Sequence, residues 1–454
     1  MTQRKNHQLG APTRTLKHPG GDPSLTEAFL GRVRGKVLLL LCLMYLITYI
    51  DRVNIATAAP FMQKDLGLSN TELGLALSAF SIPYAFFQIF GGMIGDRFGP
   101  RKVLGIVGFM WGLATIYTGF ATGLLTLFAA RLALGFSEGA SFPTATHAMA
   151  KWLPEERRAF GQGITHSFSR LGNAIAPIFI ALLIGVWGWR ESFWVGGVVS
   201  MIWVFFWIAY YRDNPKDHPK INPKEIDELP SYQTSARLHT AIPWKLLIKR
   251  IAPVTFIDFC YGWTLWVYLT WMPSFFSGHY GLDLQKFALF TTLVLVAGVV
   301  GDTVGGLFSD HLMRRTHNLR LARRTVLVIG LSGAFVFILP TLFFANLAVV
   351  TISLALAFFS LELCNSVLWA IPMDIAPRHA GTAGGLMNTG FGVAGITSPL
   401  TFGFLLDQTG NWVVPFAVSA ALLLVGALAS LRVKPRPIDV PEADLVDGEV
   451  GVVR

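Results

Sequence analysis

The amino-acid sequence predicts an all-α membrane protein, with twelve transmembrane helices arranged as two pseudo-symmetric six-helix bundles. Of its 454 residues, 53% are hydrophobic and only 14% are charged, whereas a soluble domain carries about 25% charged residues. Long apolar segments, an uneven distribution of basic residues between loops and a weak internal repeat are the observations behind this prediction. The composition excludes a soluble two-domain enzyme, a coiled coil and a disordered chain.

Each predicted transmembrane helix is an apolar segment long enough to cross the hydrocarbon core of a bilayer, which takes about 20 helical residues. The segments are divided at clusters of charge and at Pro/Gly turns. Glycine and proline inside them are tolerated, because neighbouring helices satisfy the freed backbone groups. In chain order the predicted spans are 36–62, 71–95, 103–122, 124–149, 159–186, 190–211, 247–277, 286–309, 325–344, 346–373, 380–406 and 411–431.

The distribution of lysine and arginine predicts that both termini are cytoplasmic. With that orientation, 31 of the 37 basic residues lie in cytoplasmic segments, and only Lys64, Arg190 and Lys286 lie in loops outside. Cytoplasmic loops of membrane proteins carry this excess of positive charge. The net charge of +10 is therefore an insertion signal, and we expect no binding to nucleic acid.

A polar stretch rich in Pro, Lys and Glu divides the chain into two halves that resemble each other weakly. Gly67 recurs 214 positions later as Gly281, and Trp189 recurs 223 positions later as Trp412. Two related halves imply a binding site at their interface near the bilayer midplane. The predicted domains are a disordered cytoplasmic N-terminal tail (1–35), an N-terminal six-helix bundle (36–211), a cytoplasmic linker (212–245), a C-terminal six-helix bundle (246–431) and a cytoplasmic C-terminal tail (432–454).

The loop after the second predicted span carries glycines, one acid and several basic residues. Its sequence at 92–102, GMIGDRFGPRK, resembles the G-x-x-x-D-R-x-G-x-[RK]-[RK] motif of the major facilitator superfamily, and a degenerate copy has His311 after its acid. The glycines allow close helix packing, while the charges are able to form an ionic latch across the cytoplasmic face. The motif predicts a gate and is silent about substrate. The predicted gating residues are Gly92, Asp96, Arg97, Gly99, Arg101, Lys102 and Asp310.

Five ionisable side chains lie well inside predicted spans, where each central charge costs about 2.5–3.5 kcal/mol on insertion scales. Charges at this depth persist only if they pair or face a watery cavity, so we interpret them as functional; a buried network that only fixes helix packing is the alternative. Adjacent residues on a helix lie about 100° apart and do not pair with each other. The five are Asp51, Arg52, Arg131, Glu138 and Arg170.

These charges are similar in arrangement to those of the anion:cation symporter branch of that superfamily, whose bacterial members carry sugar acids such as galactonate, hexuronates and glucarate, and also phthalate. The resemblance covers residues 36–431. It implies that Asp51 and Glu138 bind protons and that Arg131 tunes Asp51. It also implies that Arg52, Tyr84 and Asn388 contact the substrate. The resemblance is carried by Tyr49-Ile-Asp51-Arg52-Val-Asn54, Tyr84, Arg131-x6-Glu138-Gly139 and Gly385-Leu-Met-Asn388-Thr389.

Other polar and aromatic side chains complete the predicted cavity. Arg170 has two open interpretations: it binds the second carboxylate of a dicarboxylate, as arginine forks do, or it pairs with a nearby acid. Asp302 is expected near the cytoplasmic end of its span, in a structural or gating role. Asp258 and Glu362 are either helix-packing groups or extra proton sites, and neither is assigned to one of these roles. The predicted substrate-binding residues are Arg52, Tyr49, Tyr84, His166, Arg170, Asn365, Trp369, Asn388 and Thr389.

We therefore expect a proton-coupled symporter that imports a sugar acid by alternating access, with protons as the coupling ion and no other cofactor. Import of an aromatic or other dicarboxylate and anion exchange remain alternatives. The cavity arginines disfavour cationic drugs and neutral sugars, and no nucleophile–base pair, metal-ligand spacing or phosphate loop indicates an enzyme. The three cysteines lie in apolar runs, which predicts neither disulfides nor zinc. The family resemblance further implies a monomer in the lipid bilayer of a bacterial inner (plasma) membrane.

Overall fold

The computed structural model describes residues 32–227, 229, 243–376 and 380–438. The predicted disordered N-terminal tail lies outside these residues up to position 31, as do parts of the predicted linker and of the predicted C-terminal tail. Within the described residues the chain forms helices and no strands.

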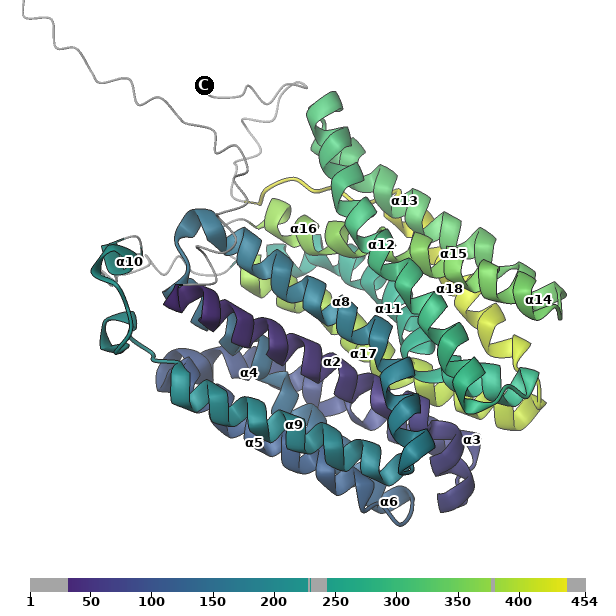
Figure 1. The fold of residues 1–454 in the computed structure, drawn as a ribbon. Helices are drawn as coiled ribbons and strands as arrows, with labels where there is room; N and C mark the ends of the chain where they lie inside the picture. Colours follow the sequence, from purple (N-terminus) through teal and green to yellow (C-terminus); the bar gives the residue numbers. More distant parts are fainter. Residues whose placement is uncertain (1–31, 228, 230–242, 377–379, 439–454) are drawn as a thin grey trace, which may run out of the picture.

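The first half of the chain forms eight helical segments, coloured purple to teal in Figure 1. Two short elements, η1 (Pro215–Asp217) and α10 (Pro223–Asp227), follow them. The segments are α2 (Val33–Leu66), α3 (Asn70–Ala79), α4 (Ser81–Phe98), α5 (Pro100–Gly119), α6 (Leu124–Gly139), α7 (Ser141–Trp152), α8 (Glu155–Val186) and α9 (Trp189–Tyr210).

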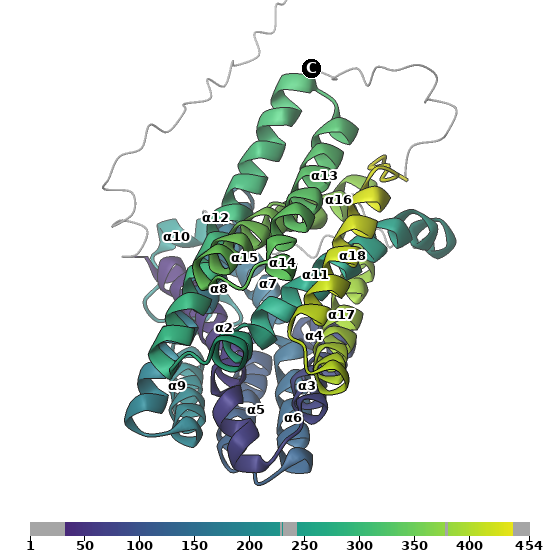
Figure 2. The ribbon, with the colours of Figure 1, turned by 90° about the vertical axis from the view of Figure 1, so that its right-hand side faces the viewer.

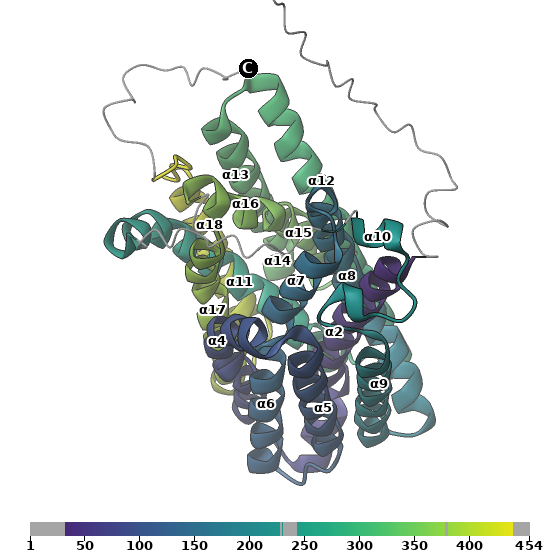
Figure 3. The ribbon, with the colours of Figure 1, turned by 90° about the vertical axis from the view of Figure 1, so that its left-hand side faces the viewer.

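The second half repeats this plan and lies beside the first (Figures 1 and 2). In the view of Figure 3, α5, α6 and α9 lie together in one bundle, while α12, α13 and α18 lie in the other. Its segments are α11 (Trp244–Tyr280), α12 (Leu284–Thr316), α13 (Leu319–Ile338), α14 (Pro340–Phe343), α15 (Leu347–Glu362), α16 (Asn365–Ile375), α17 (Ala380–Thr409) and α18 (Val413–Ser430).

Each of the twelve predicted spans corresponds to one helix or to an interrupted pair, which confirms the predicted fold class. Nine helical stretches of the described chain are long and apolar enough to cross a membrane by length and composition. The predicted ends were wrong where charged residues continue a helix: α12 runs to Thr316 and α13 starts at Leu319. Hydropathy falls at these charges, but arginine and leucine are good helix formers, so the helices project past the apolar segment.

Four predicted spans are interrupted rather than continuous. The breaks fall at Phe80 between α3 and α4, at Ala140 between α6 and α7, at Leu339 between α13 and α14, and at 363–364 between α15 and α16. At the break between α3 and α4, the backbone of α6 approaches closely: a Cβ at Gly135 would lie 2.0 Å from the carbonyl oxygen of Phe80. Prolines follow three of the four breaks, at Pro83, Pro143 and Pro340, and a proline has no N–H to continue the helical hydrogen bonds.

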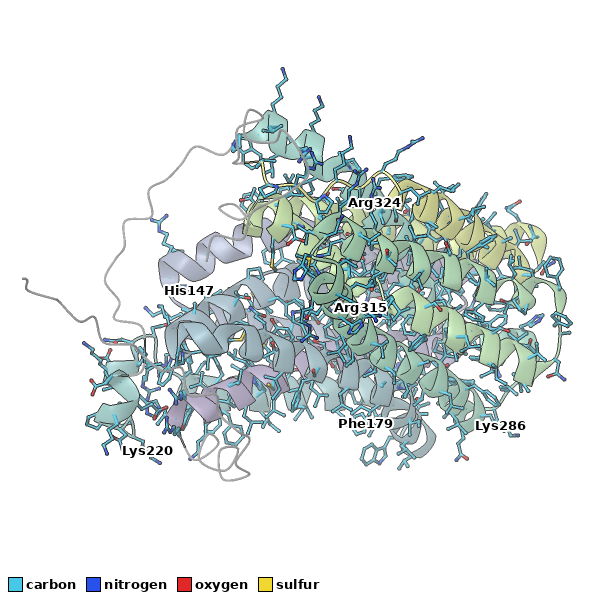
Figure 4. The ribbon with its side chains drawn as sticks, turned by 90° about the horizontal axis from the view of Figure 1, so that it is seen from above. His147, Phe179, Lys220, Lys286, Arg315 and Arg324 are labelled. Atoms are coloured by element: carbon cyan, nitrogen blue, oxygen red, sulfur yellow. The ribbon has the colours of Figure 1, made fainter. Side chains whose placement is uncertain are left out.

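The helices alternate in direction, so the bundle has two ends. We call the end that carries residues 212–227 the linker end, and the opposite end, with the turns at Gly67 and Gly410, the far end. Lys220 and Lys286 mark the linker end and the far end in Figure 4. Gly67 and Gly281, the pair in the sequence repeat, both terminate their helices with left-handed backbone, at φ of 66° and 63°. Glycine adopts this conformation without a Cβ penalty, so the repeat reflects one turn used twice.

The two halves are in contact at the far end. The carboxylate of Asp407 on α17 accepts hydrogen bonds from the backbone nitrogens of Asn70 (3.2 Å) and Thr71 (2.7 Å) at the start of α3. Close to this contact, a Cβ at Gly403 would lie 2.1 Å from the carbonyl oxygen of Asn70. Nearer the linker end of α17, a Cβ at Gly385 would meet no described atom within 4 Å.

The first part of the predicted linker packs on the N-terminal bundle. The carboxylate of Glu225 in α10 accepts from the backbone nitrogens of Val33 (3.3 Å) and Arg34 (2.8 Å). These are among the first N–H groups of α2, which have no partner within their own helix. The indole nitrogen of Trp152 donates to the carbonyl oxygen of Arg212 at 2.9 Å, so the segment is held at both of its ends.

Candidate substrate and proton site

An arginine and a glutamate from the first and fourth spans form an ion pair inside the N-terminal bundle. Nε of Arg52 on α2 donates to Oε2 of Glu138 on α6 at 2.7 Å, with side-chain exposures of 10% and 0%. Glu138 is the penultimate residue of α6, two residues before the break at Ala140. The interruption therefore places a carboxylate at the end of a helical segment within the span.

Aromatic rings surround the guanidinium of Arg52. Its Cζ lies 4.8 Å from the ring centroid of Tyr49 and 4.5 Å from that of Tyr84. Phe80 and Phe142 lie at 5.0 and 5.2 Å. Ring faces attract a cation at these distances. The four rings, which we call the aromatic box, therefore stabilise the guanidinium of Arg52, and the two phenylalanines do so without a conventional hydrogen bond.

In the Arg52–Glu138 pair, one polar atom of each side chain makes no hydrogen bond in the described chain. Nη2 of Arg52 and Oε1 of Glu138 are buried and have no hydrogen-bond partner among the described residues. Buried polar atoms in proteins are nearly always paired with protein or ordered water. The spare donor and acceptor therefore mark a place for water, a proton or a ligand group.

Arg131 and Asp51 complete this cluster of four charged groups. Arg131 on α6 is 3% exposed, its Cζ lies 5.1 Å from the Phe80 ring, and its Nε and Nη1 have no partner within the described part of the chain. Asp51 is 1% exposed, and its Oδ2 accepts from the hydroxyl of Ser200 on α9 at 3.1 Å. We call Asp51, Arg52, Arg131 and Glu138 the N-bundle cluster; with both acids ionised its formal charge is zero.

A second ionic cluster joins the two halves. Nε of Arg170 on α8 pairs with Oδ2 of Asp302 on α12 at 3.1 Å, and its Nη1 lies 3.3 Å from Oε2 of Glu362 on α15. The amide nitrogen of Asn365 donates to Oδ1 of Asp302 at 3.1 Å. We call Arg170, Asp302, Glu362 and Asn365 the cross-bundle cluster.

This cluster shows the acid pairing that was one of the two interpretations of Arg170, and it corrects one expectation. The structure pairs Arg170 with acids, both of them from the other half of the chain. The expectation that Asp302 lies near the cytoplasmic end is wrong, because α12 continues for 14 residues beyond it and places it at mid-length opposite Arg170. The helix extension that hydropathy missed is the reason for this error.

The remaining predicted substrate residues occupy several places. His166 contacts the ring of Tyr45 edge-on at 5.6 Å, and Trp369 is 42% exposed beside Gly384. Asn388 is partly buried on α17. The hydroxyl of Thr389 donates to its own helix at Leu386 (2.6 Å), and Thr389 lines an apolar groove between α11 and α17, so it lies apart from both ionic clusters.

The predicted gating loop is ordered by an acid that the sequence reasoning missed. Gly99 has a φ of 83°, and the backbone nitrogen of Arg101 donates to Asp213 at 3.0 Å. The guanidinium of Arg101 donates to the carbonyl oxygen of Ile208 at 2.8 Å. Arg97, Lys102 and Asp310 are exposed or nearly so, while the side-chain surroundings of Gly92 and Asp96 lie outside the described residues.

Other functional positions also escaped the sequence reasoning. Phe80 and Phe142 complete the box around Arg52, Ser200 binds Asp51, and Asp407 fastens α17 to α3. An acid placed just before the turn at Gly410 is a weak signal for the last of these. The others are common apolar or hydroxyl residues in a span, and nothing in their spacing distinguishes them.

Twelve spans in two bundles, with ionic clusters buried within and between the bundles, define a multi-pass membrane transporter. Residues 41–399 and 318–449 match the family described as Major Facilitator Superfamily, and the chain belongs to it. It is a transporter and not an enzyme.

Similar proteins of this family have named substrates. A probable sulfoacetate transporter of Cupriavidus necator is 50% identical over 421 residues, which are 92% of this chain and 98% of the relative. A hexuronate transporter of Bacillus subtilis is 31% identical, covering 87% of this chain and 93% of that protein. A D-galactonate transporter of Escherichia coli is 31% identical, covering 90% and 97%.

A solved structure supports the fold alone. The crystal structure of a bacterial homologue of the human lysosomal transporter Spinster, in an inward-facing and unoccupied conformation, superposes with a TM-score of 0.74 at 16% identity. The match covers 89% of this chain and 98% of that chain.

Proposed function

We propose that this protein is a proton-coupled symporter that imports a small organic anion by alternating access across a bacterial inner membrane. The Arg52–Glu138 ion pair, buried in an aromatic box with one spare donor and one spare acceptor, carries this proposal. It contains the two groups that such a symporter needs, a fixed cation for the anion and a carboxylate for the proton.

The charge balance of the N-bundle cluster gives the coupling. A proton on Glu138 neutralises the partner of Arg52, whose guanidinium then binds the anionic group of the substrate through two parallel N–H donors. A proton on Asp51 leaves Arg131 without a compensating charge and completes the positive site. Because coupling between two ligands is reciprocal, bound anion also raises proton affinity, so each favours the other.

The contacts at the far end fit an inward-facing state. With both termini cytoplasmic, as the basic residues favour, the linker end faces the cytoplasm and the far end faces outward. Asp407 and the close approach at Gly403 then hold the two halves together on the outer side. Release of the far-end contact and closure of the linker end complete the transport cycle.

A short organic dianion of the sulfocarboxylate class is the substrate that we favour. Two arginines in one cluster, Arg52 and Arg131, offer three buried nitrogens without a hydrogen-bond partner among the described residues, enough for two anionic groups. Of the predicted hydroxyl-binding groups, Asn365 is already bound to Asp302. Sulfoacetate has one sulfonate, one carboxylate and no hydroxyl, and the 50% identical relative is named for it.

Sugar acids are the second candidate. Relatives named for hexuronate and D-galactonate are 31% identical, and Tyr49, Tyr84 and Asn388 offer side chains that bind hydroxyls. A sugar acid would use one arginine for its carboxylate and these side chains for its polyol. Competition between the two classes during uptake ranks them directly.

The test is uptake into proteoliposomes of purified protein under an imposed pH gradient, alkaline inside. We expect labelled sulfoacetate to accumulate, up to about tenfold for each coupled proton per pH unit. Glu138→Gln should abolish uphill uptake but retain exchange of internal for external substrate at equal pH. Glu72→Gln, at a half-buried capping glutamate of α3 outside the N-bundle cluster, is the matched control. Uphill uptake by Glu138→Gln equal to that of wild type would refute the assignment.

A further inference from the structure

The cross-bundle cluster contains more negative than positive charge. One guanidinium, that of Arg170, is paired with two carboxylates, those of Asp302 and Glu362. With both acids ionised the cluster has a formal charge of −1 within the membrane spans, and a buried charge without compensation is strongly unfavourable. One proton on either carboxyl makes the cluster neutral.

The hydrogen bonds indicate which carboxyl takes that proton. Both oxygens of Asp302 are occupied, Oδ2 by Arg170 and Oδ1 by Asn365, and its side chain is 20% exposed. Glu362 is 1% exposed. Nη1 of Arg170 lies 3.4 Å from Oε1, to which it donates a long hydrogen bond, and 3.3 Å from Oε2, with which it makes an ion pair but no hydrogen bond. The carboxyl of Glu362 is therefore less fully hydrogen-bonded than that of Asp302, and a proton on Oε2 gives that oxygen a hydrogen to donate.

The surroundings of Glu362 supply a hydrogen-bonding neighbour and, among the described residues, no further arginine or lysine. Tyr261 on α11 is within hydrogen-bonding reach of the Glu362 carboxyl, and its buried hydroxyl makes no other hydrogen bond in the described chain. On α12, a Cβ at Gly298 would lie 3.0 Å from Cγ of Glu362, so the absence of a side chain there admits the glutamate. The titratable and charged groups around the cluster are Arg170 and His166 on α8, Asp302 on α12, Tyr261 and Asp258 on α11, Tyr49 on α2 and Cys364 beside α13.

Glu362 also lies one residue from the position that the 223-residue repeat assigns to a counterpart of Glu138. The two glutamates are 224 positions apart, against the offset of 223 that relates Trp189 to Trp412. Each lies at the end of the first segment of an interrupted span: Glu138 is the penultimate residue of α6, and Glu362 is the last residue of α15. Each is paired with an arginine from another helix. Each bundle thus holds a buried, arginine-paired carboxylate next to the break of the corresponding span.

We propose that Glu362 is a second coupling site, which binds one transported proton in addition to those bound by the N-bundle cluster. This inference rests on the proposed function, since it adds a proton to a proton-coupled cycle. Protonation of Glu362 removes one of the two ion pairs that Arg170 makes across the bundle interface. The halves are then held there by the Arg170–Asp302 pair alone, so the protonation state of Glu362 changes the contact between them.

The extra proton matches the extra charge of a dianion. Two protons carried with a substrate of charge −2 move no net charge, so the membrane potential would not drive that import. A third proton gives a net charge of +1 per cycle, and an inside-negative potential then favours uptake. The cross-bundle cluster therefore supplies what a sulfocarboxylate carrier needs beyond the carboxylates of the N-bundle cluster.

The experiment measures charge moved per substrate in proteoliposomes, from the membrane potential at which net flux of labelled sulfoacetate reverses at fixed pH and substrate gradients. Wild type should move one positive charge per substrate. Glu362→Gln should move none and still accumulate substrate in response to the pH gradient, with one proton fewer per cycle. An unchanged charge-to-substrate ratio in Glu362→Gln would overturn the inference.

Asp258→Asn is the matched control, because Asp258 is a buried acid of the same bundle whose Oδ2 accepts from the backbone nitrogen of Phe391 at 3.1 Å. It should keep the wild-type ratio, and loss of a charge there as well would also overturn the inference. If Glu362→Gln is inactive, Asp302→Asn provides the test, because it leaves one arginine and one glutamate in the cross-bundle cluster. A charge-to-substrate ratio that stays at one in this variant would place the additional proton outside the cluster and overturn the inference. A ratio of zero would support a proton site within the cluster. Absence of any pH-driven uptake in wild type would instead refute the proposed function.

Discussion

The contact between Asp407 and the start of α3 predicts that one carboxylate sets the balance between two conformations. Besides the two backbone nitrogens, the carboxylate accepts from the amide nitrogen of Asn70 at 2.8 Å and from the hydroxyl of Thr71 at 2.5 Å. All four donors belong to the other half of the transporter. Asp407→Asn retains one oxygen acceptor and loses the negative charge at the helix N-terminus, so it weakens only the far-end contact.

The magnitude follows from what comparable caps contribute. Loss of a side-chain acceptor at a helix N-terminus costs about 0.5–2 kcal/mol, and the favourable interaction of an anion with the helix dipole there is about 0.3–1 kcal/mol. Ser69 still caps α3 in the variant, through its own bond to Glu72, so we take the cap range as the whole effect. It corresponds to an equilibrium shift of about 2- to 30-fold away from the conformation closed at the far end.

Distances between spin labels in nanodiscs measure this shift. Leu125 and Phe343 are 81% and 77% exposed, lie at the far end of opposite halves, and accept cysteine replacements for labelling. The three native cysteines, Cys42, Cys260 and Cys364, are buried and do not compete for the label. Asp407→Asn should move population to longer distances across the far end.

The control is Asp283→Asn, because Asp283 caps α12 within a single half and should leave the distances unchanged. A distance distribution in Asp407→Asn that superposes on wild type would refute the reasoning. So would an equal change in Asp283→Asn, which would show a general effect of losing a cap charge.

Three further variants test other parts of the structure. Gly403→Ala places a Cβ 2.1 Å from a backbone oxygen of α3, so it should destabilise the closed far end by about 1–3 kcal/mol, seen as the same shift in label distances. Ser200→Ala removes the hydroxyl that binds Asp51. We expect the free energy of unfolding to fall by about 1–3 kcal/mol, measured by thermal unfolding, and the pH dependence of uptake to change. An unchanged pH profile would show that Ser200 takes no part in coupling. Gly99→Ala imposes a side chain at a φ of 83°, costing about 1–3 kcal/mol, and should slow exchange without changing the accumulation ratio; a wild-type exchange rate would contradict a gating role for this loop.

Hydropathy and the repeat were sufficient for the fold, because each span must hide its backbone from lipid whatever its neighbours are. Hydropathy alone did not place the breaks at Phe80 and Ala140, but the sequence carries a signal for both. Pro83 and Pro143 lie three residues after these breaks, and a proline has no N–H to donate to the carbonyl oxygen four residues earlier, so it interrupts the helix there.

The sequence identified the charged residues of the site but not their pairing. Arg131 and Glu138 share a face of one helix, yet it is Arg52 of α2 that bonds Glu138. The outcome depends on the rotation and depth of α2, which hydropathy leaves undefined. The partners of Arg170 come from the other half of the chain, and no spacing within one half contains that information.

The attachment of residues 212–227 to the N-terminal bundle has a consequence for how the protein can be assembled. The carboxylate of Glu225 accepts hydrogen bonds from the first N–H groups of α2, so this stretch is packed as part of the N-terminal bundle. A gene divided between codons 228 and 242 would leave all the helices of each bundle on one polypeptide. When they are co-expressed as two polypeptides, the halves retain the contacts at Asp407 and Arg170 that join them, so we expect the two polypeptides to associate.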